Sequence, residues 1–102
     1  MRYISERSTD PGLLVLSSLA AGPKHGYAIT RDVEEVAGVR LGPGTLYGAI
    51  TRLEQRGWIE PVPSQDRRRP YRLSSAGRAY LKEQLGSLGK VLRVALRRLE
   101  QA

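Results

Sequence analysis

The side chains best suited to chemistry in this sequence are cations that can bind phosphate. Arg67, Arg68 and Arg69 follow one another directly. A guanidinium group can donate two parallel hydrogen bonds to the oxygens of one phosphate. The chain carries 17 Lys and Arg against 10 Asp and Glu, which gives a net charge of +7. Most of this excess lies in residues 58–102. Such a balance indicates a polyanionic partner, of which nucleic acid is the commonest, although a basic protein without such a partner is the alternative.

Residue types for catalysis or metal binding are scarce. The chain has no Cys, which excludes disulfides, thiolate nucleophiles and Cys-based metal sites. His25 is the only histidine, so a His-rich metal site cannot be assembled. A catalytic triad would need this histidine beside a nucleophile and a carboxylate, and we find no such set. We therefore predict no enzyme, no metal and no cofactor, and we expect His25 to cap a helix or form a turn. No segment reaches the roughly 18 to 20 apolar residues of a membrane span, so we expect a cytoplasmic protein.

The elements that must position these side chains begin with helices. Asp10 is a good N-terminal cap and Pro11 suits a first helical position, so a largely apolar helix should start there. A second helix is expected over residues 26–37 and a third over residues 43–56. Two amphipathic helices joined by a short glycine-containing turn form a helix-turn-helix. The predicted inner stripes are Ile29, Val33 and Val36 in the second helix, and Leu46, Ala49, Ile50 and Leu53 in the third.

After the third helix the sequence becomes extended. Residues 58–62 have the composition of a short strand, in which Pro61 is compatible only with a sheet edge. Residues 71–73 can form its antiparallel partner, and the polar loop between them carries the three arginines. The predicted fold is therefore mainly α with a small β-hairpin, in the form of a winged helix-turn-helix followed by a C-terminal dimerisation helix.

The last helix, which should start near Ser74 or Ser75, carries a heptad pattern that we call the seam. Spacings of four and three residues separate its members, which are Leu81, Leu85, Leu88, Leu92, Ala95 and Leu99. This pattern favours pairing with a second copy of the chain over a helix folded back on its own domain. We therefore expect a DNA-binding domain with an N-terminal arm over residues 1–73 and a dimerisation helix over residues 74–102.

Four motifs resemble those of the PadR family of transcriptional regulators. Residues 22–29, GPKHGYAI, are similar to the family's GPxHGYxI signature, and residues 41–50, LGPGTLYGAI, to its LxPGTLYxAL recognition helix. Residues 53–59, LEQRGWI, resemble its LExxGWI motif, and residues 71–77, YRLSSAG, its YxLTxxG motif. The resemblance implies a winged-helix domain, a homodimer joined through the C-terminal helix and, usually, repression of a nearby gene.

Three features depart from the usual family pattern. Gly42 replaces the common Ser before the recognition helix, so the usual side-chain cap is missing. The wing has a compressed arginine run, and the C-terminal region is a single helix, as in the short branch of the family. Many members release DNA when a small molecule binds, so the resemblance implies a small-molecule effector. Trp58 and the apolar C-terminal helices of a dimer suit a small aromatic compound. The single helix leaves little protein for a separate effector pocket.

The residues expected to contact DNA lie on the outer face of the third helix, at the start of the second helix and in the wing. They are Lys24, Tyr27, Gly44, Thr45, Tyr47, Gly48, Arg52, Arg67, Arg68 and Arg69. Alternatives stay open for three of these assignments. Tyr47 can pack beneath the wing, Arg52 can pair with Glu54, and the three arginines can belong to an ordinary solvated loop.

These observations together indicate a sequence-specific DNA-binding regulator. We expect a repressor that acts as a homodimer on a near-palindromic operator. The alternatives are a winged-helix module whose basic wing binds an acidic protein, and an architectural DNA binder without an operator.

Overall fold

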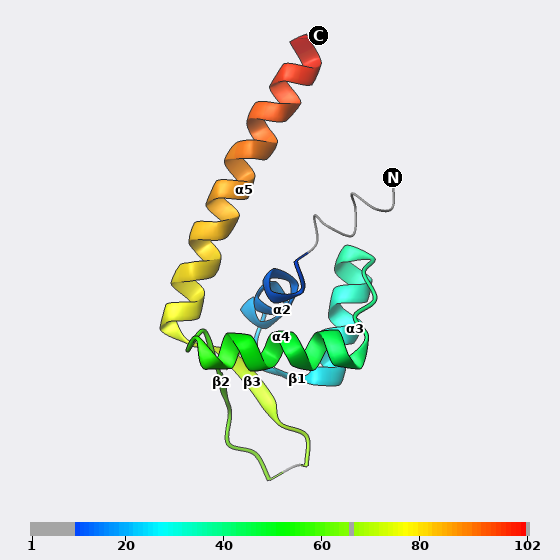
Figure 1. Ribbon diagram of the computed structural model, residues 1–102, viewed down its shortest axis with the longest axis vertical. Helices are drawn as coiled ribbons and strands as arrows, with labels where there is room; N and C mark the ends of the chain where they lie inside the picture. Colours follow the sequence, from blue (N-terminus) through cyan, green and yellow to red (C-terminus); the bar gives the residue numbers. More distant parts are fainter. Residues whose placement is uncertain (1–9, 66, 102) are drawn as a thin grey trace.

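The computed structural model describes residues 10–65 and 67–101. The elements are α2 (Pro11–Ala20), β1 (Lys24–His25), α3 (Gly26–Ala37), α4 (Pro43–Gln55), β2 (Ile59–Pro61), β3 (Pro70–Leu73) and α5 (Ser75–Gln101). Helices α2, α3 and α4 pack together with the small sheet, whereas most of α5 projects away from them (Figure 1). The loop between β2 and β3 projects on the opposite side (Figure 1). Within the described ranges, no helix combines the length and the apolar character needed to cross a membrane.

The helix starts follow from local capping. The Asp10 carboxylate accepts a hydrogen bond from the Leu13 N–H at 3.3 Å, and Pro11 occupies the first helical position of α2. His25 caps α3, where its Nδ1 accepts from the Ala28 N–H at 3.4 Å. Gly42 precedes α4 without any side-chain hydrogen bond. The predicted cap at Asp10, the capping role of His25 and the missing cap before α4 are all confirmed.

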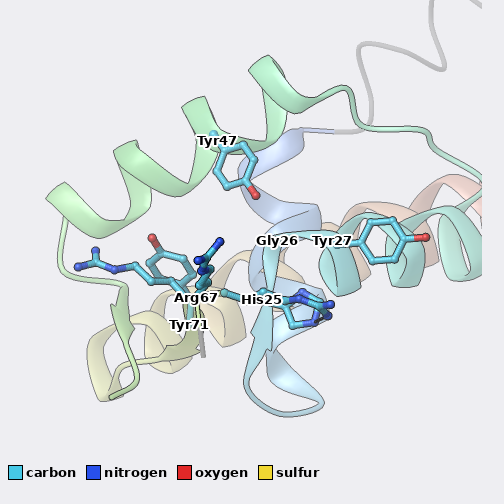
Figure 2. Close-up of a pocket in the computed structure, with 8 residues that line it drawn as sticks. His25, Gly26, Tyr27, Tyr47, Arg67 and Tyr71 are labelled. Atoms are coloured by element: carbon cyan, nitrogen blue, oxygen red, sulfur yellow. Dashed lines mark hydrogen bonds between the residues drawn. The ribbon is translucent and has the colours of Figure 1, made fainter. Parts of the chain in front are cut away.

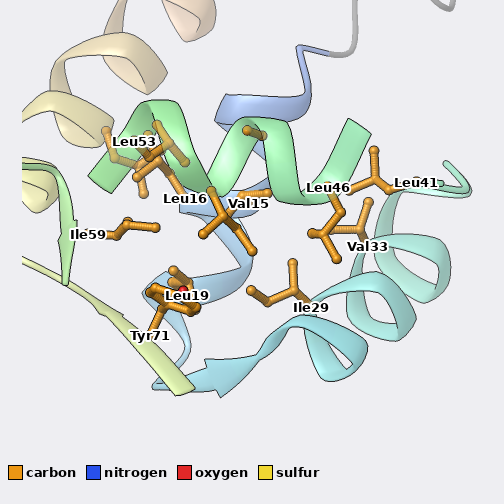
Figure 3. Close-up of a cluster of buried hydrophobic side chains, with 13 residues drawn as sticks. Val15, Leu16, Leu19, Ile29, Val33, Leu41, Leu46, Leu53, Ile59 and Tyr71 are labelled. Atoms are coloured by element: carbon orange, nitrogen blue, oxygen red, sulfur yellow. The ribbon is translucent and has the colours of Figure 1, made fainter. Parts of the chain in front are cut away.

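The core forms around α2, which contacts α3, α4, α5 and β3 (Figure 3). Because α2 is covered on several sides, it is apolar around most of its surface, and Val15 and Leu16 are completely or almost completely buried. The predicted inner stripe of α4 is confirmed, because all four of its members are buried. The stripe of α3 is wrong at Val36, which is 79% exposed. Leu41, in the link that follows α3, is the residue that enters the core there.

The sheet has a third strand that the sequence did not indicate. Its order is β1-β3-β2, with both pairings antiparallel and with Glu60 opposite Arg72. Lys24 pairs with Tyr71 and His25 with Pro70, so the residues just before α3 run beside the wing. The predicted two-stranded hairpin is therefore incomplete. Its edge strand is correct, since β2 contains Pro61 and lies at the margin of the sheet.

The first turns of α5 belong to the core of the winged helix. Gly77 and Leu81 are the buried residues of this helix, and Leu81 is only 5% exposed. Placing Leu81 in the dimerisation seam was wrong, because its side chain already packs against the core of its own domain. The division at residue 74 into a DNA-binding and a dimerisation part stays a prediction. Any such division cuts across one continuous apolar core.

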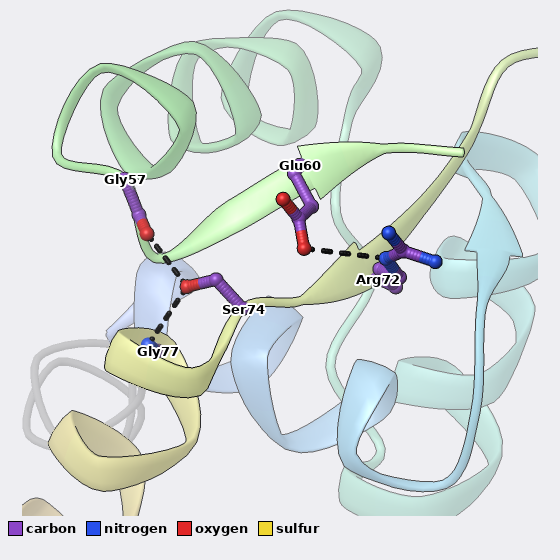
Figure 4. A network of polar contacts seen from close by, with 5 residues as sticks. All are labelled: Gly57, Glu60, Arg72, Ser74 and Gly77. Carbon is purple, nitrogen blue, oxygen red and sulfur yellow. Dashed lines mark hydrogen bonds and ion pairs between the residues drawn. The ribbon is translucent and has the colours of Figure 1, made fainter. Parts of the chain in front are cut away.

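Ser74 joins the end of α4 to the beginning of α5 (Figure 4). Its hydroxyl donates to the Gly57 carbonyl at 2.6 Å and accepts from the Gly77 N–H at 3.0 Å. Its backbone N–H donates to the Trp58 carbonyl at 3.0 Å. A Cβ on Gly77 would overlap that same Trp58 carbonyl, so only glycine lets α5 approach so closely. These contacts fix the direction in which α5 leaves the domain.

Candidate nucleic-acid interface

The outer face of α4, the wing loop and the start of α3 border one cavity of ≈ 600 Å³ (Figure 2). Its lining residues are His25, Gly26, Tyr27, Tyr47, Arg67, Arg68, Arg69 and Tyr71. Tyr27, Tyr47 and the three arginines were predicted to contact DNA, and the structure brings these residues together. The cavity is thus lined by tyrosine and arginine residues, whose hydroxyl and guanidinium groups are of the kinds that bind an extended anion such as a nucleic-acid backbone.

The outer face of α4 lies opposite its buried stripe. Gly44 and Thr45 are exposed in the first turn, and a Cβ on Gly44 would meet nothing within 4 Å. The backbone at the start of α4 is therefore open to a ligand. Farther along, the Arg52 guanidinium lies near Gly48, whose Cβ would be 3.4 Å from its Nη1. In the part of the chain that the structure describes, no carboxylate pairs with Arg52, so the alternative pairing with Glu54 is not found.

Tyr47 connects α4 to α3. Its hydroxyl points toward the backbone at Gly26 (Figure 2), and a Cβ added there would lie 2.6 Å from the Tyr47 oxygen. The Tyr47 side chain nevertheless stays 53% exposed. Its ring is thus partly packed and partly available at the mouth of the cavity. The two readings of Tyr47, packing and DNA contact, are compatible with each other.

The wing carries its cations beyond the last paired residues of the strands. The Val62 N–H donates to the Pro70 carbonyl at 2.9 Å, which extends the hairpin past β2. Arg72 lies on β3 and pairs with Glu60 at 3.2 Å, so its charge is compensated within the sheet. Arg67, Arg68 and Arg69 are exposed in the loop itself.

Lys24 lies near the start of α3, as predicted, but in strand β1, and its ammonium donates to the Ser18 carbonyl at 2.6 Å. That carbonyl belongs to the last turn of α2, where a cation is favourable because it faces the negative end of the helix dipole. The structure therefore gives Lys24 a role in holding α2, and its contact with DNA stays a prediction.

Three residues of the cavity were missed as site residues from the sequence, namely His25, Gly26 and Tyr71. His25 was expected only to cap a helix, and Tyr71 only to form a strand, yet both line the cavity. The Nε2 of His25 lies 3.4 Å from Nη1 of Arg68, across 43 positions of the chain. The sequence offered one signal for His25, which is its position next to Gly26 and Tyr27. That position does not show that the wing folds back against His25.

The remaining seam residues form an exposed apolar row along α5. Leu85, Leu88, Leu92 and Leu99 are all exposed, with Leu99 at 73%, and Ala95 lies among them. Val91 and Leu96 flank this row and are exposed as well. Side chains of this size gathered on one projecting helix indicate a surface that another protein surface covers.

Known proteins with a similar sequence or structure agree on one family. The family model described as "Transcriptional regulator PadR-like family" matches residues 15–83. The chain is 36% identical over 87 residues to the transcriptional regulator Rv3488 of Mycobacterium tuberculosis, a match covering 82% of this chain and 80% of that protein. It is 46% identical over 85 residues to an uncharacterized 37.1 kDa protein in transposon TN4556 of Streptomyces fradiae. That match covers 83% of this chain but only 25% of the transposon protein.

Among solved structures, a PadR family transcription regulator from Clostridium difficile R20291 superimposes with a TM-score of 0.79 and 26% identity. The superposition covers 89% of this chain and 99% of the other. The winged helix and the single long C-terminal helix are thus shared along nearly the whole described length.

Proposed function

Because this chain belongs to the PadR-like family of transcriptional regulators, whose members are not enzymes, we propose that it represses transcription by binding duplex DNA as a homodimer. The observation that carries this proposal is the meeting of the α4 outer face and the three wing arginines at one cavity. A helix for the major groove and cations for the flanking backbone are thereby presented on the same side of the domain. Such a regulator acts where the chromosome is, so we expect the cytoplasm.

In this proposal α4 lies in the major groove with its first turn at the base edges. Thr45 offers a hydroxyl to a base or phosphate and a methyl group to thymine, while Gly44 and Gly48 permit close approach of the backbone. Tyr47 lies beside the first turn of α4, near the base edges, Tyr27 donates its hydroxyl to the DNA backbone, and Arg52 contacts phosphate farther along. The wing arginines contact the neighbouring backbone or minor groove.

Dimerisation through α5 is supported by the exposed seam from Leu85 to Leu99. The helix has 27 residues, of which only Gly77 and Leu81 are buried in the domain. A twofold dimer presents two copies of α4 to one face of DNA. Its operator would then be a near-palindrome with half-sites about one helical turn apart.

Regulation by a small aromatic compound is part of the same proposal and rests on the family. Trp58 and Tyr80 stack with ring centroids 3.7 Å apart, and the Arg56 guanidinium lies 5.2 Å from the Trp58 ring. These two rings border a cavity of ≈ 230 Å³ that Leu88 of the seam also lines. A ligand beside the seam can weaken DNA binding only if it binds the DNA-free conformation of the dimer more tightly than the DNA-binding conformation.

The test begins with selection of bound duplexes from a random DNA library by the purified protein. Gel shifts then compare a selected duplex with an unrelated duplex of equal length, over a range of salt concentrations. We expect salt-sensitive binding that prefers the selected sequence, and repression of transcription in vitro from a promoter that overlaps it. Equal binding to both duplexes would support an architectural role, and no binding to either would support a protein-interaction module.

A further inference from the structure

His25 performs two tasks with the two nitrogens of one ring. Its Nδ1 accepts a hydrogen bond from the Ala28 N–H and so caps α3. A neutral imidazole has one accepting nitrogen, and its other nitrogen carries the hydrogen. The cap therefore determines the tautomer: Nε2 is a donor, because Nδ1 already supplies the lone pair.

The Nε2–H of His25 lies next to a second donor. Nη1 of Arg68 is 3.4 Å away, and a guanidinium group has no acceptor to offer. Neither group can accept a hydrogen bond from the other while Nδ1 caps the helix. Two donors from different parts of the fold, the start of α3 and the wing, thus converge on one place.

The surroundings of this place favour an anion as the common acceptor. His25 and Arg68 line the ≈ 600 Å³ cavity together with Arg67 and Arg69, and its described lining contains no carboxylate. Tyr47 and Tyr71 also line this cavity and bring no negative charge to it. An oxygen of a phosphate group can accept from both Nε2 and Nη1 at once.

We propose that His25 and Arg68 bind one phosphate of the DNA backbone between them, with the neutral imidazole as donor. This inference rests on the proposed function, which supplies the phosphate beside α4. It makes His25 a DNA-binding residue in addition to a helix cap.

A neutral donor can be told apart from a cation by its salt dependence. Counterion release depends on the positive charges that neutralise phosphates, so removing a neutral donor leaves the slope of log K against log salt unchanged. Removing an arginine that contacts phosphate lowers that slope by roughly one. The contact is to the backbone, so a duplex of random sequence is a sufficient probe.

The decisive variant is His25→Asn, because Asn keeps a side-chain acceptor for the cap but loses the distant donor. We expect it to bind a random duplex about tenfold more weakly, with an unchanged salt slope and an unchanged melting temperature. Arg68→Ala should weaken binding and reduce the slope by roughly one. The double variant should lose less affinity than the product of the two single fold-changes, because both donors act on one phosphate.

Two controls keep the test decisive. His25→Ala removes cap and donor together, so its loss of melting temperature, absent in His25→Asn, measures the cap alone. His25 is the only histidine, so its ring nitrogens give unambiguous NMR signals in the wild-type protein. We expect the Nε2–H tautomer before DNA is added.

A folded His25→Asn protein that binds the random duplex as tightly as the wild type would overturn the phosphate site and leave the proposed function intact. An Nδ1–H tautomer in the free protein would overturn it as well, even if His25→Asn does not fold. A wild-type protein that binds no duplex would overturn the proposed function itself, and this inference with it.

Discussion

The hydroxyl of Tyr47 lies against the backbone of Gly26, so the outer face of α4 and the first residue of α3 meet without a side chain between them (Figure 2). A Cβ at position 26 would lie 2.6 Å from the hydroxyl oxygen and 3.0 Å from Cζ of the ring. Glycine is required here for space rather than for an unusual backbone angle. The orientation of Tyr47 at the candidate interface therefore depends on Gly26.

Substituting Gly26 with Ala should displace the Tyr47 ring. Relative to a substitution without this contact, we expect a loss of no more than about 1 kcal/mol in the free energy of unfolding, because the methyl group meets the far end of a half-exposed side chain that can move aside. Urea denaturation of Gly26→Ala measures this loss. Gly44→Ala is the matched control, since it also lies in the first turn of a helix but its Cβ would meet nothing within 4 Å. Equal stability of the two variants would contradict the proposed contact.

Arg67→Ala and Arg69→Ala should weaken binding to all duplexes alike. Each arginine sits on a short loop and is expected to contact the backbone, which carries no sequence information. The slope of log K against log salt should fall by roughly one for each substitution. Binding isotherms on a selected and a random duplex at several salt concentrations measure both quantities. A loss confined to the selected duplex would show that the wing reads sequence.

Thr45→Ala and Tyr47→Ala should have the opposite signature. Both residues lie near the start of α4, where a recognition helix meets base edges. The ratio of affinities for the selected and the random duplex should shrink, with the salt slope nearly unchanged. The same isotherms provide the measurement. An equal loss of affinity for both duplexes, with the ratio and the slope unchanged, would assign these side chains to the backbone instead.

Replacing Leu88 and Leu92 together with Asp should separate the dimer. Both side chains are exposed in the single chain, so the variant should still fold, but burying two carboxylates in the seam costs several kcal/mol. Light scattering should then report half the wild-type mass. Ser87→Asp, one position outside the seam, should leave the mass unchanged. A dimer that survives the double substitution would show that other residues form the interface.

Gly77→Ala should destabilise the domain by about 3 kcal/mol or more, because its methyl group meets the backbone carbonyl of Trp58 and not a movable side chain. Gly86→Ala is the control in the same helix. Its Cβ would meet nothing within 4 Å, so the better helix propensity of Ala should raise stability by up to about 1 kcal/mol. Thermal unfolding followed by circular dichroism compares the two. Loss of stability in Gly86→Ala instead would indicate that a partner helix approaches there.

Much of the fold was predictable because its signals are local. The cap at Asp10, the start of α4 at Pro43 and the edge position of Pro61 each depend on the chemistry of one or two neighbouring residues. The buried stripe of α4 follows from the helical period alone. The candidate interface was partly predictable for the same reason, since the face opposite a buried stripe is exposed.

Helical periodicity shows which face of a helix is apolar but not what covers that face. Val36 continues the stripe of α3 yet lies beyond the core, and Leu81 continues the seam of α5 yet lies inside it. Only the positions of the neighbouring elements distinguish these two cases. The sequence determined that α5 has an apolar face, and the packing of its first turns decided where the part left for a partner begins.

The contacts that build the site are long-range, and for that reason only the tertiary structure decided them. Pairing of β1 with β3 brings His25 to the wing, and packing of α4 near α3 brings Tyr47 to Gly26. The Lys24 ammonium is directed to the Ser18 carbonyl. The sequence by itself determined which elements form and that the wing is basic. Which side chains share the cavity depended on contacts between distant segments, and no local pattern specifies those.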